Sequence, residues 1–326
     1  MHNRLSAALT SIVVLSLFAI VIDASDNYTV NNAASLDITA HTVCRDVTNN
    51  SATGASVYVP TESALEWESF YTNPPAGVTA GSCATTVTIT ADRSNVNLCT
   101  LAGNPTAPGD YIFVIESGVD VYSTNTSNAA LVTGSCWPTG TTLTVINKGR
   151  IYGKGGKGGD GSDANSSNPP SPQAGAAGGP AISMSYPLSI NNSSGYIYGG
   201  GGGGGGGGAS YGKGASTGGN GGGGGASGPS SSAGGAGGSS QNTSAGVKGA
   251  SGTTSGGGAG GEKGIYGMGG DGGAFGASGT KGGTGSGGSH PGANGGAAGK
   301  AIDMNNRALT WLGGNTSSRV KGSVSN

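Results

Sequence analysis

Glycine is so concentrated in the second half of this 326-residue chain that an ordinary hydrophobic core cannot form there. Of the 71 glycines, 8 fall in residues 1–148 and 63 in residues 149–326. Glycine buries almost no apolar surface, and in a helix each one costs roughly 1 kcal/mol relative to alanine. The second half therefore excludes a helical fold. It also excludes collagen, because the glycines keep no strict third-residue period and the chain has only 13 prolines.

Charge divides the chain at the same place. Residues 1–148 carry 4 Lys/Arg and 11 Asp/Glu, whereas residues 149–326 carry 11 Lys/Arg and 5 Asp/Glu. The net charge of −1 therefore hides an acidic and a basic half. The basic residues form no cluster, so we expect no nucleic-acid partner.

Residues 1–25 form a hydrophobic leader. Arg4 precedes an apolar run that is densest between Ile12 and Ile22, and Ala24 is a candidate residue before a cleavage point. This order is typical of a secretory signal. A buried or oligomer-forming segment and a membrane anchor remain as alternatives.

The four cysteines all lie in the first half. They are Cys44, Cys83, Cys99 and Cys136, and no CxxC pair occurs among them. An even number after a possible signal favours two disulfides, with three possible pairings. The alternative is four reduced cysteines buried as small apolar side chains.

Residues 26–148 are typical of a β-rich attachment domain. Alternating apolar residues predict strands in 85–91, 111–122 and 141–146. The segment 60–75 is the exception, because an apolar stripe between Thr61 and a Pro-Pro pair predicts one short helix.

No catalytic constellation is present in the sequence. The three histidines are His2, His41 and His290, and none has a partner at a fixed spacing. Residues 1–148 also lack the serine-hydrolase elbow and the zinc-protease motif. We therefore expect a protein that is not an enzyme and that has no metal site and no cofactor.

The glycine runs of residues 149–326 have two interpretations. Gly/Ser-rich chains are usually flexible linkers. Against this, apolar residues border the runs, and residues 301–315 predict two strands around an Asn305–Asn306 turn, as in an ordered cap. The ordered alternative is a packed sandwich of polyglycine II helices, which have three residues per turn and rise about 3.1 Å per residue.

The run INKGRIYGKGGKGGDG at 146–161, the segment SGYIYGGGGGGGGGG at 194–208 and the closing segment 298–326 carry a family resemblance. Together they resemble the glycine-rich receptor-binding domains of tailed-bacteriophage tail-fibre tip adhesins and host-specificity proteins. The resemblance covers residues 141–326. It implies a sandwich of polyglycine II helices in 149–326, with loops that bind an outer-membrane protein or a surface glycan of the host bacterium. It also implies a place at the tip of a virion tail fibre.

By that resemblance, contacting side chains would come from the insertions between glycine runs. Aromatic and long side chains are favoured as recognition anchors. The candidates are Tyr211, Lys213, Tyr266, Met268, Phe275 and His290. For Tyr266 and Phe275 the alternative is a packing role between layers. The N-terminal half would join a tail fibre or a second copy of the chain.

Two other functions remain open. A cleaved signal with disulfides would indicate a secreted or cell-surface glycine-rich structural protein, because a phage adhesin needs no secretory signal. An ice-binding protein is less favoured, since bulky loops would interrupt its flat faces.

Overall fold

The structure is a computed structural model. It describes residues 84–164, 170–212, 215–240, 244–262, 267–285 and 290–326, together with five strands between Val21 and Ser82. The chain divides into two compact units, Met1–Thr85 and Thr86–Asn326. Residues 1–20 of the expected leader and the expected helix at 60–75 lie outside the described residues. No helix among the described residues is long and apolar enough to cross a membrane.

The first unit contains an antiparallel sheet in which sequence neighbours pair. Its strands are β1 (Val21–Asp23), β2 (Asp26–Val30), β3 (Ser35–Ala40), β4 (Val43–Asn49) and β5 (Val78–Ser82).

The second unit is built on three parallel sheets of five strands each. The first sheet contains β6 (Thr85–Ile89), β9 (Asp110–Ile115), β12 (Thr142–Asn147), β15 (Leu188–Asn191) and β20 (Leu309–Gly313). The second sheet contains β7 (Arg93–Ser94), β10 (Asp120–Tyr122), β13 (Arg150–Tyr152), β16 (Tyr196–Tyr198) and β21 (Val320–Lys321). The third sheet contains β8 (Val96–Asn97), β11 (Leu131–Val132), β14 (Ile182–Ser183), β19 (Ile302–Asp303) and β22 (Val324–Ser325).

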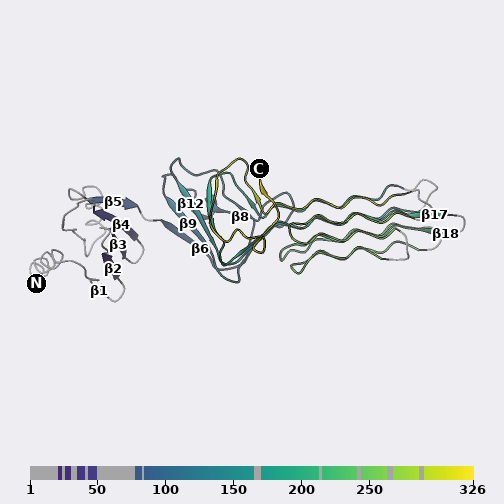
Figure 1. Ribbon diagram of the computed structural model, residues 1–326, viewed down its shortest axis with the longest axis horizontal. Helices are drawn as coiled ribbons and strands as arrows, with labels where there is room; N and C mark the ends of the chain where they lie inside the picture. The colour runs from purple at the N-terminus through teal and green to yellow at the C-terminus, as the bar shows by residue number, and fades with distance from the viewer. Residues whose placement is uncertain are drawn as a thin grey trace, which may run out of the picture. The chain divides into compact units, whose positions relative to one another are not determined.

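In chain order the strands visit the first, second and third sheets in turn, and then begin again. The chain therefore winds through successive coils of a three-sided parallel β-solenoid (Figure 1). We call its strands and the short links between them the solenoid. The expected strands at 85–91, 111–122 and 141–146 are confirmed by β6, β9, β10 and β12. The expectation of little helix is confirmed too, since α3 (Leu98–Leu101) is the helix that the described residues contain.

Columns of stacked apolar side chains fill the solenoid. Because parallel strands pair in register, one residue from each coil stacks on the next. The second sheet contributes Val121, Ile151, Ile197 and Val320; the first contributes Phe113, Val145, Ile190 and Trp311; the third contributes Leu131, Ile182, Ile302 and Val324. The members of these columns in the inner coils are fully buried. Burial of each such side chain stabilises the fold by about 1.5–3 kcal/mol.

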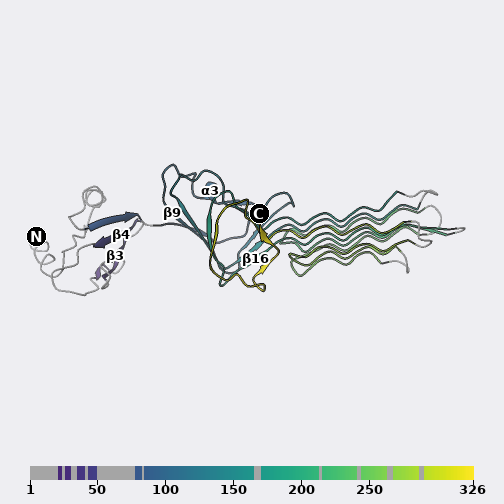
Figure 2. The ribbon, with the colours of Figure 1, turned by 45° about the horizontal axis from the view of Figure 1, so that its top comes forward.

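The glycine-rich chain is inserted into the solenoid rather than attached after it. Residues 153–181 connect β13 to β14, and residues 199–301 connect β16 to β19. Both insertions leave from the corner between the second and third sheets, in consecutive coils. We call these two insertions the glycine body (Figure 2). The three parallel sheets thus join strands from both sides of residue 148, where the composition changes.

The C-terminal segment is ordered but does not form a hairpin. Asn305 and Asn306 have φ of 46° and 60°, so the expected turn is present. The strands on its two sides, β19 and β20, enter different sheets and pair with earlier coils. The expected strands on the two sides of this turn are therefore confirmed, and each of them continues a parallel sheet rather than pairing with the other.

Backbone hydrogen bonds with a three-residue period hold the glycine body together. Gly156 and Gly159 donate to Gly201 and Gly204, each at 2.8 Å. Along the run 199–208, successive N–H groups from Gly200 donate in rotation to three different segments, 173–179, 220–226 and 277–283. Carbonyls in 198–207 accept from three others, 153–162, 270–276 and 293–299. The ten-glycine run is therefore enclosed by six neighbouring segments.

This enclosure explains why the run contains nothing but glycine. An added Cβ at any position from Gly200 to Gly208 would lie closer than 3.0 Å to a neighbouring backbone atom. The outer segment 153–164 behaves differently, since Lys154, Lys157 and Asp160 occupy every third position between its glycines.

Aspartates cap amides on the outside of the glycine body. Asp160 accepts from the Ala236 N–H at 2.7 Å, and Asp271 accepts from the Gly260 N–H at 2.8 Å. Burial raises the pKa of Asp160, but the Ala236 N–H and Lys157 outweigh it and hold that pKa below its usual value. The ionised carboxylate therefore stabilises this edge.

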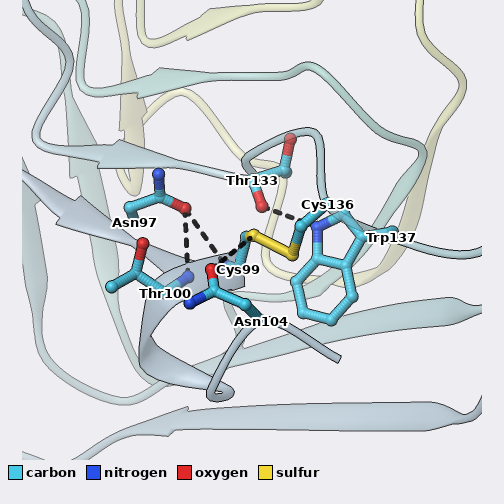
Figure 3. The surroundings of a disulfide bond; sticks show 7 residues. All are labelled: Asn97, Cys99, Thr100, Asn104, Thr133, Cys136 and Trp137. Atoms are coloured by element: carbon cyan, nitrogen blue, oxygen red, sulfur yellow. Dashed lines mark hydrogen bonds between the residues drawn. A yellow bond between two sulfur atoms is a disulfide. The ribbon is translucent and has the colours of Figure 1, made fainter. Parts of the chain in front are cut away.

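One disulfide links the first two coils of the solenoid. Cys99, in α3, is bonded to Cys136 in the loop after β11 (Figure 3). Asn97 caps α3 by accepting from the Cys99 N–H at 3.0 Å, and Trp137 Nε1 donates to the Thr133 carbonyl at 2.7 Å. Cys83 and the side chain of Cys44 lie outside the described residues, so a second disulfide stays a prediction.

Candidate functional site

The glycine body extends away from the solenoid to an end marked by β17 (Ser210–Gly212) and β18 (Ala215–Thr217), which we call the distal end (Figure 1). Five segments, 165–169, 213–214, 241–243, 263–266 and 286–289, lie outside the described residues. The residues that flank them are bonded to one another across the end. Ala164 donates to Ser239, Thr217 bridges to Ser244, and Gly267 donates to Thr284.

The opposite turns of the glycine body lie against the solenoid. Ser230 Oγ donates to the Ser123 carbonyl at 2.9 Å, and Lys154 Nζ donates to the Ser230 and Ser231 carbonyls at 2.6 and 2.7 Å. Burial lowers the pKa of Lys154. The glycine body thus has one end fixed to the solenoid and one end that carries loops.

Side chains reinforce the distal end from inside. The fully buried Asn220 donates from Nδ2 to the Gly267 carbonyl at 3.1 Å, and its Oδ1 accepts from the Val247 N–H at 2.8 Å. Asp163 Oδ1 accepts from the Ser239 hydroxyl at 2.7 Å. Sequence reasoning missed these residues. The capping role of Asp160 could have been predicted from the sequence, because Asp160 continues the every-third-residue spacing of Lys154 and Lys157.

Several of the residues predicted from the sequence come together at the distal end. Tyr211 lies in β17 (Ser210–Gly212), which pairs with β18 (Ala215–Thr217) in an antiparallel hairpin. Met268 follows Gly267 directly, and its side chain is 42% exposed. His290 accepts from the Gly285 N–H through its carbonyl at 3.0 Å. Lys213 and Tyr266 lie outside the described residues.

Phe275 lies at the other end of the glycine body. Its ring centroid is 5.2 Å from those of both Tyr152 and Tyr198, on the second sheet of the solenoid. Phe275 is therefore not grouped with Met268 and His290, and its contacts are those of the packing alternative.

Among the described residues, no group of three or more His, Cys, Asp or Glu side chains could hold a metal ion. The distal end presents the paired strands β17 and β18 and the exposed Met268 on a hydrogen-bonded frame, an arrangement suited to recognition.

The family model "Phage tail fibre adhesin Gp38" matches residues 84–324, which covers the solenoid and the glycine body. Among solved structures, the gp37–gp38 adhesin tip complex of the bacteriophage S16 long tail fiber contains a similar chain. It is 24% identical, with a TM-score of 0.49, over 77% of this chain and 90% of that one. No curated protein matches this chain. The family match confirms the resemblance drawn from the glycine runs: this chain belongs to the phage tail fibre adhesin Gp38 family, and is a receptor-binding protein of the virion tail fibre and not an enzyme.

Proposed function

We propose that this adhesin sits at the tip of its fibre and contacts its host receptor through the distal end of the glycine body. We also propose that the segments of the glycine body are polyglycine II helices. The observation that carries both is the enclosure of the run 199–208, because it supports a rigid frame with loops at its far end.

The three-residue rotation of the hydrogen bonds supports polyglycine II. A helix with three residues per turn directs successive N–H groups about 120° apart, so every third amide meets the same neighbour. A β-strand alternates with a period of two and has neighbours on two sides only. Backbone carbon chemical shifts of residues 200–208, in isotope-labelled protein, would test this assignment. Values typical of φ near −75° and ψ near 145° are expected, and β-strand values would contradict it.

The receptor contact would come from Tyr211, Lys213, Tyr266, Met268 and His290. Large side chains on loops give contact area, and the frame behind them limits the entropy lost on binding. The receptor would be an outer-membrane protein or a surface glycan of the host bacterium. Treating host cells with protease or with periodate would separate these two receptor classes.

Attachment to the fibre would fall to the N-terminal part, residues 26–148. In the S16 long tail fiber, gp38 forms a complex with gp37 at the adhesin tip. We propose a corresponding tail-fibre partner for this chain, with self-association as the alternative outcome of a pull-down.

The test of receptor binding uses the full chain and whole host cells. Replacement of residues 210–217 by a short Gly-Ser turn, combined with Met268→Ser, is expected to reduce cell binding at least about tenfold. Ser278→Ala is the control, because Ser278 is exposed in the turn at the solenoid end. Equal binding by both variants, with unchanged melting temperatures, would refute the proposed surface.

A further inference from the structure

The outer face of the second sheet carries two neighbouring columns of aromatic and charged residues. In one column Tyr122, Tyr152 and Tyr198 pair in register, and Lys321 follows on β21. In the other column, Asp120 pairs with Arg150 and Arg150 with Tyr196, and Arg319 follows just before β21. The residues between the two columns point inward and form the core.

Part of this face is used for packing. Tyr152 is 4% exposed, and Phe275 covers both it and Tyr198. Burial raises the pKa of the Tyr152 phenol to about 12. Arg150 forms an ion pair on this face, because its Nε donates to Asp120 at 2.6 Å. The Phe275 contacts anchor the glycine body on the solenoid, and the ion pair with Asp120 neutralises Arg150.

The edge of the same face is open. Tyr196 is 37% exposed, and its ring lies 5.6 Å from that of Tyr198. The Arg319 guanidinium lies 5.4 Å from the Tyr196 ring centroid, and Lys321 Nζ lies 4.9 Å from the Tyr198 centroid. One bond fixes the guanidinium in place, from Arg319 Nη1 to the Gly195 carbonyl at 3.1 Å.

These two cations lack a counter-charge. Within the part of the chain that the structure describes, neither Arg319 nor Lys321 forms an ion pair. Arg319 ends the turn before β21 and Lys321 lies on β21, and their cationic groups lie over the neighbouring rings of Tyr196 and Tyr198. The two cations therefore lie on the same face, over rings whose centroids are 5.6 Å apart. An anion of the size of a phosphate can contact both: the planar guanidinium binds it bidentately, and the ammonium acts as a point charge.

The size of the patch decides what kind of ligand fits. One open aromatic ring and two cations are too few for a stable protein interface, which buries about 800 Å² per partner. A single nucleic-acid strand would need a row of stacking rings. One sugar ring on Tyr196, with its phosphate between Arg319 and Lys321, uses every group of the patch. The phosphorylated core sugars of lipopolysaccharide present this chemistry on a bacterial surface.

We propose that Tyr196, Arg319 and Lys321 form a second binding site, on the solenoid, for a phosphorylated sugar of the host lipopolysaccharide. This site is separate from the distal end and does not depend on the receptor bound there. It would hold the adhesin at the cell surface while the distal loops search for their receptor. The patch and the distal end lie on different parts of the second unit, so they can be tested independently.

Saturation-transfer NMR and calorimetry on the full chain would test the site with three probes: glucose 6-phosphate, glucose and inorganic phosphate. Glucose 6-phosphate is expected to bind most tightly, and its affinity should fall as salt is added. Arg319→Gln and Tyr196→Ala should each weaken binding at least about tenfold, while Tyr196→Phe keeps it. The matched control is Arg307→Gln, at an exposed arginine outside this patch.

Immobilised lipopolysaccharide, before and after enzymatic dephosphorylation, supplies the cell-surface ligand. The chain with residues 210–217 replaced should still bind the phosphorylated form, which separates this site from the proposed receptor contact. The proposal is overturned if inorganic phosphate binds as well as the sugar phosphate, if Arg307→Gln loses as much affinity as Arg319→Gln, or if dephosphorylation leaves binding unchanged. Melting temperatures of all variants should match that of the parent chain.

Discussion

A single methyl group at Gly204 tests the packing of the glycine body most directly. In Gly204→Ala, the new Cβ would lie closer than 3.0 Å to the Gly270 carbonyl and to the Asp271 carbonyl carbon. These are backbone atoms, so the segment that contains them must move outward as a whole. That movement breaks the bonds from Gly270 to the Gly205 carbonyl and from Gly273 to the Gly202 carbonyl, both 2.8 Å.

The cost of this change follows from its parts. Two backbone hydrogen bonds contribute about 0.5–1.5 kcal/mol each, and overpacking adds about 1–3 kcal/mol. Alanine also restricts the unfolded chain, which offsets about 0.4–1 kcal/mol. The expected loss of unfolding free energy is about 3 kcal/mol. For a unit of this size, the melting temperature should fall by roughly 6–12 °C.

Gly283→Ala is the matched control. The nearest atom to its added Cβ is the Met268 amide nitrogen at 3.1 Å, so a small shift accommodates the methyl. Both variants gain the same restriction of the unfolded chain, and their difference isolates the clash. Thermal melts would compare them, together with amide exchange of the glycine run. The packing argument fails if Gly204→Ala is destabilised no more than Gly283→Ala.

Other contacts of the second unit make similar predictions. Reduction of the Cys99–Cys136 bond, which closes a separation of 37 residues, should cost about 4 kcal/mol in denaturant unfolding, and reductant should have no further effect on the Cys99→Ala/Cys136→Ala chain. The lowered pKa of Asp160 means that its stabilising charge is present above the unfolded pKa and is lost as pH falls through the folded one. Below about pH 4, the parent chain should therefore lose stability more steeply than Asp160→Asn, and parallel pH-dependent melts would refute this. Phe275→Ala removes two ring contacts and should cost about 1–3 kcal/mol without changing cell binding, whereas a loss of binding at full folding would make Phe275 a receptor contact.

Local patterns in the sequence predicted local features of the fold. Period-two alternation located β6, β9 and β12, and Asn305–Asn306 predicted a turn at the right place. The glycine runs excluded an ordinary core and carried the family resemblance. Each of these signals depends on residues that are close together in the chain.

Pairings between distant residues were not predictable in this way. On one side β16 pairs with β21, and most of the glycine body separates the two strands in the chain. No local pattern encodes that register, so the sequence did not reveal a solenoid with an insertion. Residues of the glycine body were hard to place for a related reason. Consecutive segments reverse direction, so the end at which Phe275 or Met268 lies depends on how many reversals precede it.

The hydrogen-bond partners along residues 199–208 repeat every three residues, so the length of the glycine body can change only in steps of three residues. One extra residue within the run would turn every following amide by a third of a circle, away from its acceptor and toward the wrong neighbour. A lengthening is tolerated only as a triplet, made in the adjoining segments together. The strands β17 and β18, which pair antiparallel directly after the run, are outside this three-residue pattern. Substitutions at the distal end can therefore alter receptor contacts without changing the length of the glycine body.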